Sequence, residues 1–177
     1  MVWYDPPEEG KQYIRYAKMG LSEIPVSVGG RITFEDGTQI GTGSPRMTLL
    51  WERKELICSI CGIAAGFAAI EAHLDTPEAK HLNFYSYDFS GKEVMLTWDH
   101  VIPKSKSGTN FQNNAQCLCE ICNGMKGNDD NKPSSVQVKR KAKGMPIKYL
   151  YLADGSRIFQ WTKKQWSTTL NGDSNNT

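Results

Sequence analysis

Two Cys-x-x-Cys pairs carry the clearest chemical signal in this sequence. The pairs are Cys58 with Cys61 and Cys119 with Cys122. Two intervening residues let one tight turn present both sulfurs to one ion, and four thiolates complete the tetrahedron that zinc prefers. A disulfide framework is disfavoured because a fifth cysteine, Cys117, is left over, and a redox Cys-x-x-Cys does not explain two copies. We therefore predict a structural zinc site with these two pairs as its ligands.

A second group of residues, beside the second Cys pair, has the types needed for phosphodiester hydrolysis. Four thiolates leave the zinc no open position, so catalysis has to lie elsewhere. Asp99 and Asn123 offer hard oxygen atoms, which suit Mg²⁺ or Mn²⁺ better than zinc. His100 can take a proton near neutral pH, so it is a candidate base for activating a water molecule. A metal ligand next to a base serves both needs of the reaction.

The position of Asp99 and His100 along the chain sets a condition on the local structure. They follow a β-prone stretch, Val94 to Trp98, and precede Ile102 and Pro103. Neighbouring residues of a regular strand point to opposite faces, so the pair cannot meet one phosphate from an ideal strand. We expect the strand to end, twist or bulge here, and Pro103 favours an ending.

Around these residues the chain resembles the HNH endonucleases, a family of the ββα-metal class. The family pattern is a strand ending in Asp-His-[Ile/Val]-x-Pro, a loop bearing an Asn, a second strand, and Cys-x-x-Cys-[His/Asn]-x-x-Lys-Gly. This sequence matches it with DHVIP from Asp99, with Asn114, and with CEICNGMKG from Cys119. Asn113 is the alternative for the loop Asn, and the spacing to Asn123 favours Asn114.

The resemblance covers roughly residues 56–130 and implies an α+β fold. The implied core is a ββα-metal unit with a structural zinc knuckle, flanked by small N-terminal and C-terminal α/β accessory segments. The resemblance also implies that His100 is the general base, that Asp99 and Asn123 bind the catalytic metal, and that Asn114 braces the loop behind the histidine. The implied reaction is hydrolysis of DNA to 5′-phosphate and 3′-hydroxyl ends. Because Asn123 replaces a second His, a soft metal such as Ni²⁺ is a poorer partner.

The chain of 177 residues is long enough for one domain with appendages. We expect an N-terminal accessory segment (1–55), a zinc-stapled nuclease core (56–130), a basic C-terminal segment with a hairpin (131–170) and a disordered tail (171–177). In the first segment we expect a helix over 8–19, a hairpin over 31–40 and a helix from Ser44-Pro45 to about Leu56. The Ala-rich stretch 63–80 is expected to be partly helical.

The elements expected around the site follow from alternating apolar residues and turn signals. They are a hairpin of strands 82–89 and 93–98, a strand over 115–118, a helix from about Cys122 to Gly127, a linker over 128–135 and a hairpin over 147–161. Cys117 is expected to be a packed thiol in the second strand.

Charge is distributed unevenly along the chain. Nine Lys and Arg stand against fourteen Asp and Glu before His100, and twelve stand against five from His100 onward, so a net −5 is followed by a net +7. This asymmetry favours binding of nucleic acid by the second half, although a solvated basic face has the same composition. The candidate phosphate contacts are Lys104, Lys106, Lys126, Lys139, Arg140 and Lys141.

The sequence also bears on cell location and on other functions. The longest apolar run, residues 63–70, is too short to span a membrane. The N-terminus does not resemble a signal peptide and thiolate ligands require reducing conditions, so we expect a cytoplasmic protein, by resemblance encoded by a phage or mobile element. A zinc-dependent nucleic-acid-binding module without catalysis fits the cysteines and basic stretches equally well. It does not explain why Asp99, His100, Asn114 and Asn123 occur together, and an RNA-directed nuclease differs only in substrate.

Overall fold

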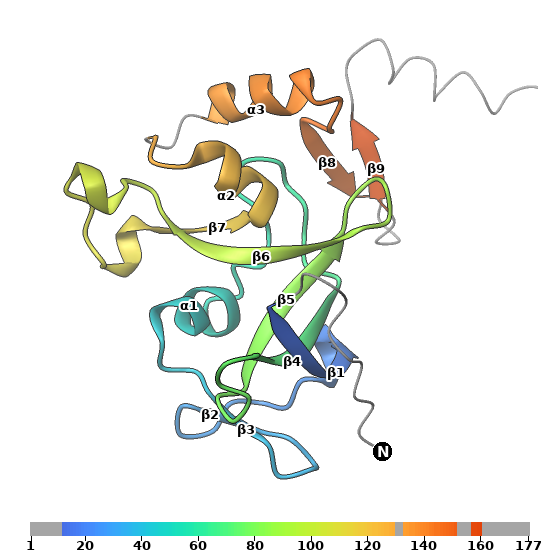
Figure 1. Ribbon diagram of the computed structural model, residues 1–177, viewed down its shortest axis with the longest axis vertical. Helices are drawn as coiled ribbons and strands as arrows, with labels where there is room; N and C mark the ends of the chain where they lie inside the picture. Colours follow the sequence, from blue (N-terminus) through green and yellow to red (C-terminus); the bar gives the residue numbers. More distant parts are fainter. Residues whose placement is uncertain (1–11, 130–132, 152–156, 161–177) are drawn as a thin grey trace, which may run out of the picture.

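A five-stranded antiparallel sheet is the centre of the computed structural model, which describes residues 12–129, 133–151 and 157–160 (Figure 1). The strands stand in the order β1-β4-β5-β6-β7. They are β1 (Tyr13–Gly20), β4 (Phe67–His73), β5 (His81–Tyr87), β6 (Glu93–His100) and β7 (Ala115–Cys119). Two further hairpins are β2 (Arg31–Thr33) with β3 (Gln39–Gly41), and β8 (Lys148–Tyr151) with β9 (Arg157–Gln160).

Short helices cover the sheet. The α-helices are α1 (Pro45–Met47), α2 (Glu120–Lys126) and α3 (Pro133–Ala142); a π-helical turn η2 (Thr48–Glu52) continues α1, and 3-10 turns are η1 (Leu21–Glu23), η3 (Lys104–Lys106) and η4 (Gln112–Asn114). In Figure 1, α2 and α3 lie on one side of β6, and α1 with η2 lies on the other. No helix in the described ranges has the length and apolar character required to cross a membrane.

The main core lies between the sheet and η2. Phe84 of β5 and Leu96 of β6 are fully buried, and Leu50 and Trp51 of η2 pack in the same cluster. The rings of Trp51 and Phe84 stack with their centroids 6.1 Å apart. This packing fixes the position of β6, whose last residues are the predicted site.

Several elements confirm the predictions. The hairpin over 31–40, the hairpin of β5 and β6, the strand β7 and the helix α2 all occur where the sequence pattern placed them. Ser44 caps α1, because its Oγ accepts a hydrogen bond from the Met47 N–H at 3.2 Å. The predicted α+β class is confirmed. The strand β6 ends at His100, which agrees with the expectation that the strand ends, twists or bulges at Asp99 and His100.

Two segments that were predicted to be helical contain strands instead, and these two strands are neighbours in the sheet. In the described part of residues 8–19 the chain forms β1, and the Ala-rich stretch contains β4. The two strands pair antiparallel, with a register shift between Arg15 and Ala17. Because β4 is interior to the sheet, six of its seven residues are buried, and the run from Phe67 to Ile70 is apolar without alternation; such a run does not distinguish a strand from a helix.

Two boundaries also differ from the prediction. The helical segment after Ser44 ends at Glu52 rather than near Leu56, and Lys54 has a left-handed φ of 57° that does not continue a helix. The helix α3 begins at Pro133, inside the predicted linker. The predicted tail over 171–177 lies outside the described residues.

Candidate active site and metal centre

The four cysteines of the two pairs lie together, as predicted. Their Sγ atoms are all within 4.8 Å of one another, and all four side chains are buried. The Sγ atoms of Cys61 and Cys119 are 3.7 Å apart. Two ligands of one tetrahedral zinc, with zinc–sulfur bonds of about 2.3 Å, stand about 3.8 Å apart. The geometry and the chemistry of this donor set therefore fit one Zn²⁺ ion.

Tight turns present the sulfurs of each pair. In the first, the Gly62 N–H donates to the Cys58 carbonyl at 2.8 Å, and Gly62 has a φ of 77°, a conformation that favours glycine. In the second, the Cys122 N–H donates to Cys119 Sγ at 3.4 Å at the start of α2. The two turns bring the four sulfurs into one buried cluster, where four negative charges would repel one another. Four thiolates thus require a bound cation.

The carboxylate of Asp99 has one occupied and one available oxygen. Asp99 lies near the end of β6, opposite Gln116 of β7. Its Oδ2 accepts a hydrogen bond from Gln116 Nε2 and pairs with Lys126 Nζ, both at 3.0 Å. Its Oδ1 accepts no hydrogen bond from the residues that the structure describes. This oxygen is therefore available to a metal ion.

Asn123 offers a second oxygen on the same side of β6. Its Nδ2 donates to Thr97 Oγ1 at 3.1 Å, which leaves the amide oxygen as the atom able to act as a ligand. Thr97 and Asp99 share a strand face because they are two residues apart. The helix α2 covers that face, since Asn123 contacts Thr97 and Lys126 contacts Asp99. A carboxylate and an amide oxygen with room for water fit Mg²⁺ or Mn²⁺.

His100 is held at the end of β6 by two neighbours. Its ring packs edge-to-face against Trp98, with the centroids 4.3 Å apart. Its Nε2 lies 3.0 Å from Asn110 Oδ1. A histidine whose Nε2–H donates to Asn110 keeps the Nδ1 lone pair to accept a proton. By strand alternation His100 starts on the opposite face from Asp99, and it is the last residue of the strand.

Asn114 closes the loop between β6 and β7. Its Oδ1 accepts from the Ile102 N–H at 2.8 Å, and its Nδ2 donates to the carbonyls of Ile102 and Thr109 at 3.0 and 2.8 Å. The loop passes so close to itself that a Cβ on Gly108 would lie 1.7 Å from the Ile102 carbonyl oxygen. The loop segment that carries Asn110 is thereby fixed beside the end of β6.

Gln116 is a site residue that the sequence pattern did not identify. Its Oε1 accepts from Ser59 Oγ at 3.0 Å, and its Nε2 donates to Asp99. Ser59 belongs to the first cysteine turn, so a chain of hydrogen bonds joins the metal centre to the candidate catalytic carboxylate. The β6–β7 register places Gln116 directly across from Asp99, and this register is the signal that could have found it.

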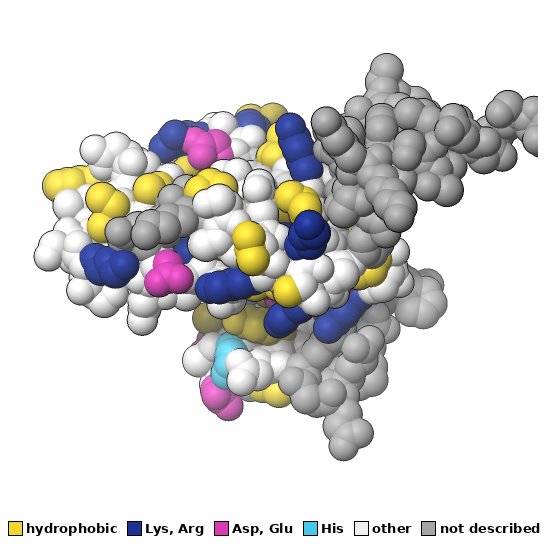
Figure 2. All heavy atoms as spheres, turned by 90° about the horizontal axis from the view of Figure 1, so that it is seen from above, with side chains coloured by type: hydrophobic (Ala, Val, Ile, Leu, Met, Phe, Trp, Pro, Cys, Tyr) yellow, Lys and Arg dark blue, Asp and Glu magenta, His cyan; other side chains and the backbone are white. Residues whose placement is uncertain are grey.

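Four of the six predicted phosphate contacts lie at the surface. Lys104 and Lys106 are exposed in η3, and Lys139 and Lys141 are exposed in α3. Figure 2 looks onto the molecule from the α3 side and shows Lys and Arg side chains over this face. Their exposure is compatible with the predicted contact.

The structure corrects the prediction for the other two cations. Lys126 is buried, where it pairs with Asp99 and donates to the His100 carbonyl at 2.8 Å. Arg140 is 1% exposed and directs its guanidinium at Cys122 Sγ. Side chains in these positions support the site from inside the protein and do not form a docking surface.

Comparison with known proteins agrees with this geometry. Residues 87–129 match the family model described as HNH endonuclease. The matched segment contains β6, the closed loop, β7 and α2, and so includes Asp99, His100, Asn114 and Asn123. No curated protein and no solved structure matched the chain. The segment that matches the HNH endonuclease model thus lies within a larger sheet.

Proposed function

We propose, from the premise that residues 87–129 form an HNH endonuclease segment, that this protein is a metal-dependent endonuclease that hydrolyses DNA phosphodiester bonds. The observation that carries the proposal is the arrangement at the end of β6. Asp99 and Asn123 each keep an oxygen available on the α2 side, and His100 is held at the strand end. A nucleic-acid-binding module has no need of that combination.

In the proposed reaction the side chains act as base, as metal ligands and as groups that orient these residues. His100 takes a proton from the attacking water, and Asn110 and Trp98 hold its ring during this step. Asp99 and Asn123 would hold Mg²⁺ or Mn²⁺, which stabilises the charge that develops on the phosphate and on the leaving oxygen. Lys126 and Gln116 keep the Asp99 carboxylate in one orientation. The proposed products carry 5′-phosphate and 3′-hydroxyl ends.

The proposed substrate is double-stranded DNA. The exposed lysines of η3 and α3 would contact phosphates on either side of the cut, with no role in reading sequence. Asn114 acts indirectly, because its three hydrogen bonds fix the loop that carries Asn110. We therefore assign Asn114 a positioning role rather than direct contact with the substrate.

Cleavage of supercoiled plasmid tests the proposal. The zinc-loaded protein is incubated with Mg²⁺, Mn²⁺ or EDTA, alongside His100→Ala and a matched histidine control, His81→Ala. His81 lies at the start of β5, where its ring packs edge-to-face against Tyr13 of β1 with the centroids 5.7 Å apart, and its Nδ1 is 3.2 Å from the Ala79 carbonyl oxygen. We expect metal-dependent nicked or linear product from wild type and His81→Ala, and a loss of about 10²- to 10⁴-fold in His100→Ala.

Two results would contradict this assignment. Full activity in His100→Ala would remove His100 as the base. A folded, zinc-loaded wild type that binds DNA and cuts no DNA under any of these conditions would favour the non-catalytic binding module instead.

A further inference from the structure

A buried arginine closes the cysteine cluster from the C-terminal side. Arg140 of α3 is 1% exposed. Its Nη1 donates to Cys122 Sγ at 3.3 Å, and its Nε donates to the Pro146 carbonyl at 2.6 Å. The guanidinium carbon lies 5.9 Å from the ring centroid of Tyr149. The guanidinium group thus joins the cysteine centre, through Nη1, to the C-terminal segment, through Nε.

The charge of the centre explains why an arginine is buried here. Zn²⁺ with four thiolates carries a net charge of −2, and a buried net charge is costly without a counter-charge. The Arg140 guanidinium is the counter-charge that the structure places here, since this buried side chain donates through Nη1 to Cys122 Sγ. The guanidinium and the cysteine cluster therefore stabilise each other's charged forms.

The backbone joins the same C-terminal segment to the first cysteine pair. The Tyr149 N–H donates to the Cys61 carbonyl at 2.7 Å. A Cβ at Gly62 would lie 3.2 Å from the Tyr149 carbonyl oxygen, so the two backbones are in close contact. Residues 133–149 thus meet Cys122 through Arg140 and Cys61 through Tyr149, while Lys141 of the same helix is exposed.

We propose that Arg140 is an outer-sphere partner of the zinc centre. It neutralises part of the tetrathiolate charge, lowers the nucleophilicity of the Cys122 sulfur and docks residues 133–149 onto the two cysteine turns. A thiolate that accepts a charge-assisted hydrogen bond holds its electron pairs more tightly, so an electrophile attacks it more slowly. This role is independent of the proposed nuclease activity.

Zinc retention tests the proposal directly. Zinc-loaded wild type, Arg140→Met, Arg140→Lys and Lys141→Ala are titrated with the chelator 4-(2-pyridylazo)resorcinol, and the transferred zinc is measured by absorbance. We expect Arg140→Met to bind zinc roughly 10- to 100-fold more weakly. Arg140→Lys should be intermediate, because an ammonium cannot reproduce the planar fork. The surface variant of the same helix, Lys141→Ala, should match wild type.

A wild-type experiment gives a second readout if Arg140→Met does not fold. The four cysteines of the zinc-loaded protein are alkylated with N-ethylmaleimide, and the order of modification is followed by peptide mass spectrometry. Cys58 and Cys122 are 1% and 0% exposed, so burial alone predicts similar rates. We expect Cys122 to react more slowly than Cys58. Equal rates, wild-type zinc affinity in Arg140→Met, or a wild type without zinc would each overturn the proposal.

Discussion

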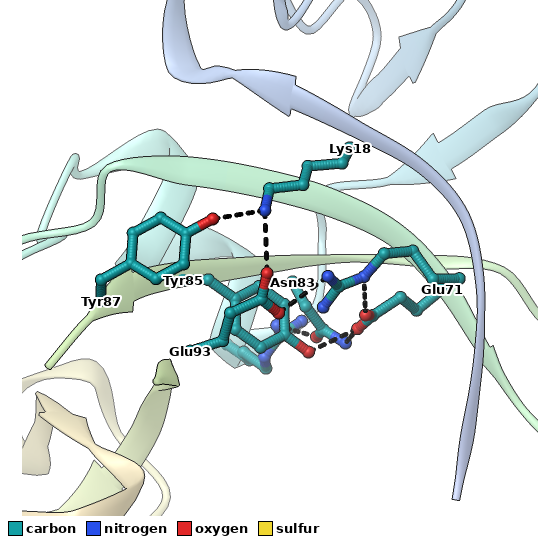
Figure 3. A network of polar contacts seen from close by, with 8 residues as sticks. Lys18, Glu71, Asn83, Tyr85, Tyr87 and Glu93 are labelled. Carbon is teal, nitrogen blue, oxygen red and sulfur yellow. Dashed lines mark hydrogen bonds and ion pairs between the residues drawn. The ribbon is translucent and has the colours of Figure 1, made fainter. Parts of the chain in front are cut away.

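Two carboxylates on the same sheet, Glu71 of β4 and Asp99 of β6, are held in opposite ways. Both oxygens of Glu71 accept hydrogen bonds: Oε1 from Arg15 Nε at 2.7 Å, and Oε2 from Asn83 Nδ2 and Tyr85 Oη, each at 2.6 Å (Figure 3). Asp99 accepts on Oδ2, and the described residues leave its Oδ1 without a donor. The Glu71 side chain is 3% exposed and that of Asp99 is 14% exposed.

The network around Glu71 continues outward until every charge has a partner. Arg15 Nη1 and Lys18 Nζ each lie 2.8 Å from an oxygen of Glu93, and Lys18 also donates to Tyr87 Oη at 2.6 Å (Figure 3). Burial would raise the pKa of Glu93, but its bonds to Lys18 and Arg15 hold it below the usual value. A carboxylate with donors on both oxygens thus stabilises the sheet, whereas one with an available oxygen at a strand end can bind a ligand.

The sharpest test of this contrast is Asp99→Asn. We expect the cleavage rate to fall by about 10²- to 10³-fold, because a neutral amide holds a divalent metal less well and supplies less charge stabilisation. The substituted amide can still place its oxygen where Lys126 and Gln116 donate, but the buried Lys126 loses its counter-charge, so we also expect a lower melting temperature. Plasmid cleavage with thermal unfolding measures both effects. An active variant would remove Asp99 from the metal site.

The isosteric change at the other carboxylate, Glu71→Gln, should reduce stability rather than cleavage. Each oxygen of Glu71 faces a donor, so either orientation of the amide puts an NH₂ group against one. We expect the free energy of unfolding to fall by about 3 kcal/mol and the melting temperature to fall by about 6–12 °C. Cleavage per folded molecule should stay near wild type. A loss of cleavage without a loss of stability would break the distinction between the two sites.

A smaller effect is expected from Gln116→Ala, which removes one support of Asp99. The Mg²⁺ concentration for half-maximal cleavage should rise roughly tenfold, because a group that orients a ligand contributes about this much to metal affinity. Gln39→Ala is the matched control, since Gln39 lies in the separate β2–β3 hairpin and accepts from Arg31 at 3.0 Å. An unchanged metal requirement would mean that Lys126 alone orients the carboxylate.

The smallest effects belong to the surface lysines. Lys104→Ala and Lys141→Ala should each reduce the slope of log affinity for DNA against log salt by about 0.9, the contribution of one phosphate contact. Lys80→Ala, from the acidic half of the chain, should leave the slope unchanged. Fluorescence anisotropy with a labelled duplex at several salt concentrations measures the slopes. Equal slopes in all variants would place the DNA on another face.

The sequence predicted the β6–β7–α2 unit well because local patterns determine it. A strand that must end at Pro103, a turn set by Cys119 and Cys122, and a helix that starts there are all readable within a few residues. The two strands β1 and β4 were missed because each is stabilised by the other at long range, from the pair Gly20 and Phe67 to the pair Tyr13 and His73, and local propensity does not report this pairing.

The supporting residues of the site were missed for the same physical reason. Gln116 acquires its role from the β6–β7 register, and Arg140 acquires its role from the docking of α3 against a cysteine turn. In the sequence, Arg140 stands between Lys139 and Lys141 and looks like one member of a basic surface run. Arg140 differs from Lys139 and Lys141 because it lies on the side of α3 that packs against the protein. Tertiary packing determines which side that is.

The cysteine centre has a consequence for how the chain reaches this fold. Cys61 and Cys119 are 58 positions apart, and β4, β5 and β6 all lie between them. A cross-link that closes a loop of this length reduces the conformational entropy of the unfolded chain by the equivalent of about 4 kcal/mol. If zinc binds early in folding, the strands therefore pair within a chain that is already closed into a loop. If zinc binds late, it binds to a sheet that has already formed. Refolding speed should thus depend on whether zinc is present at the start of folding.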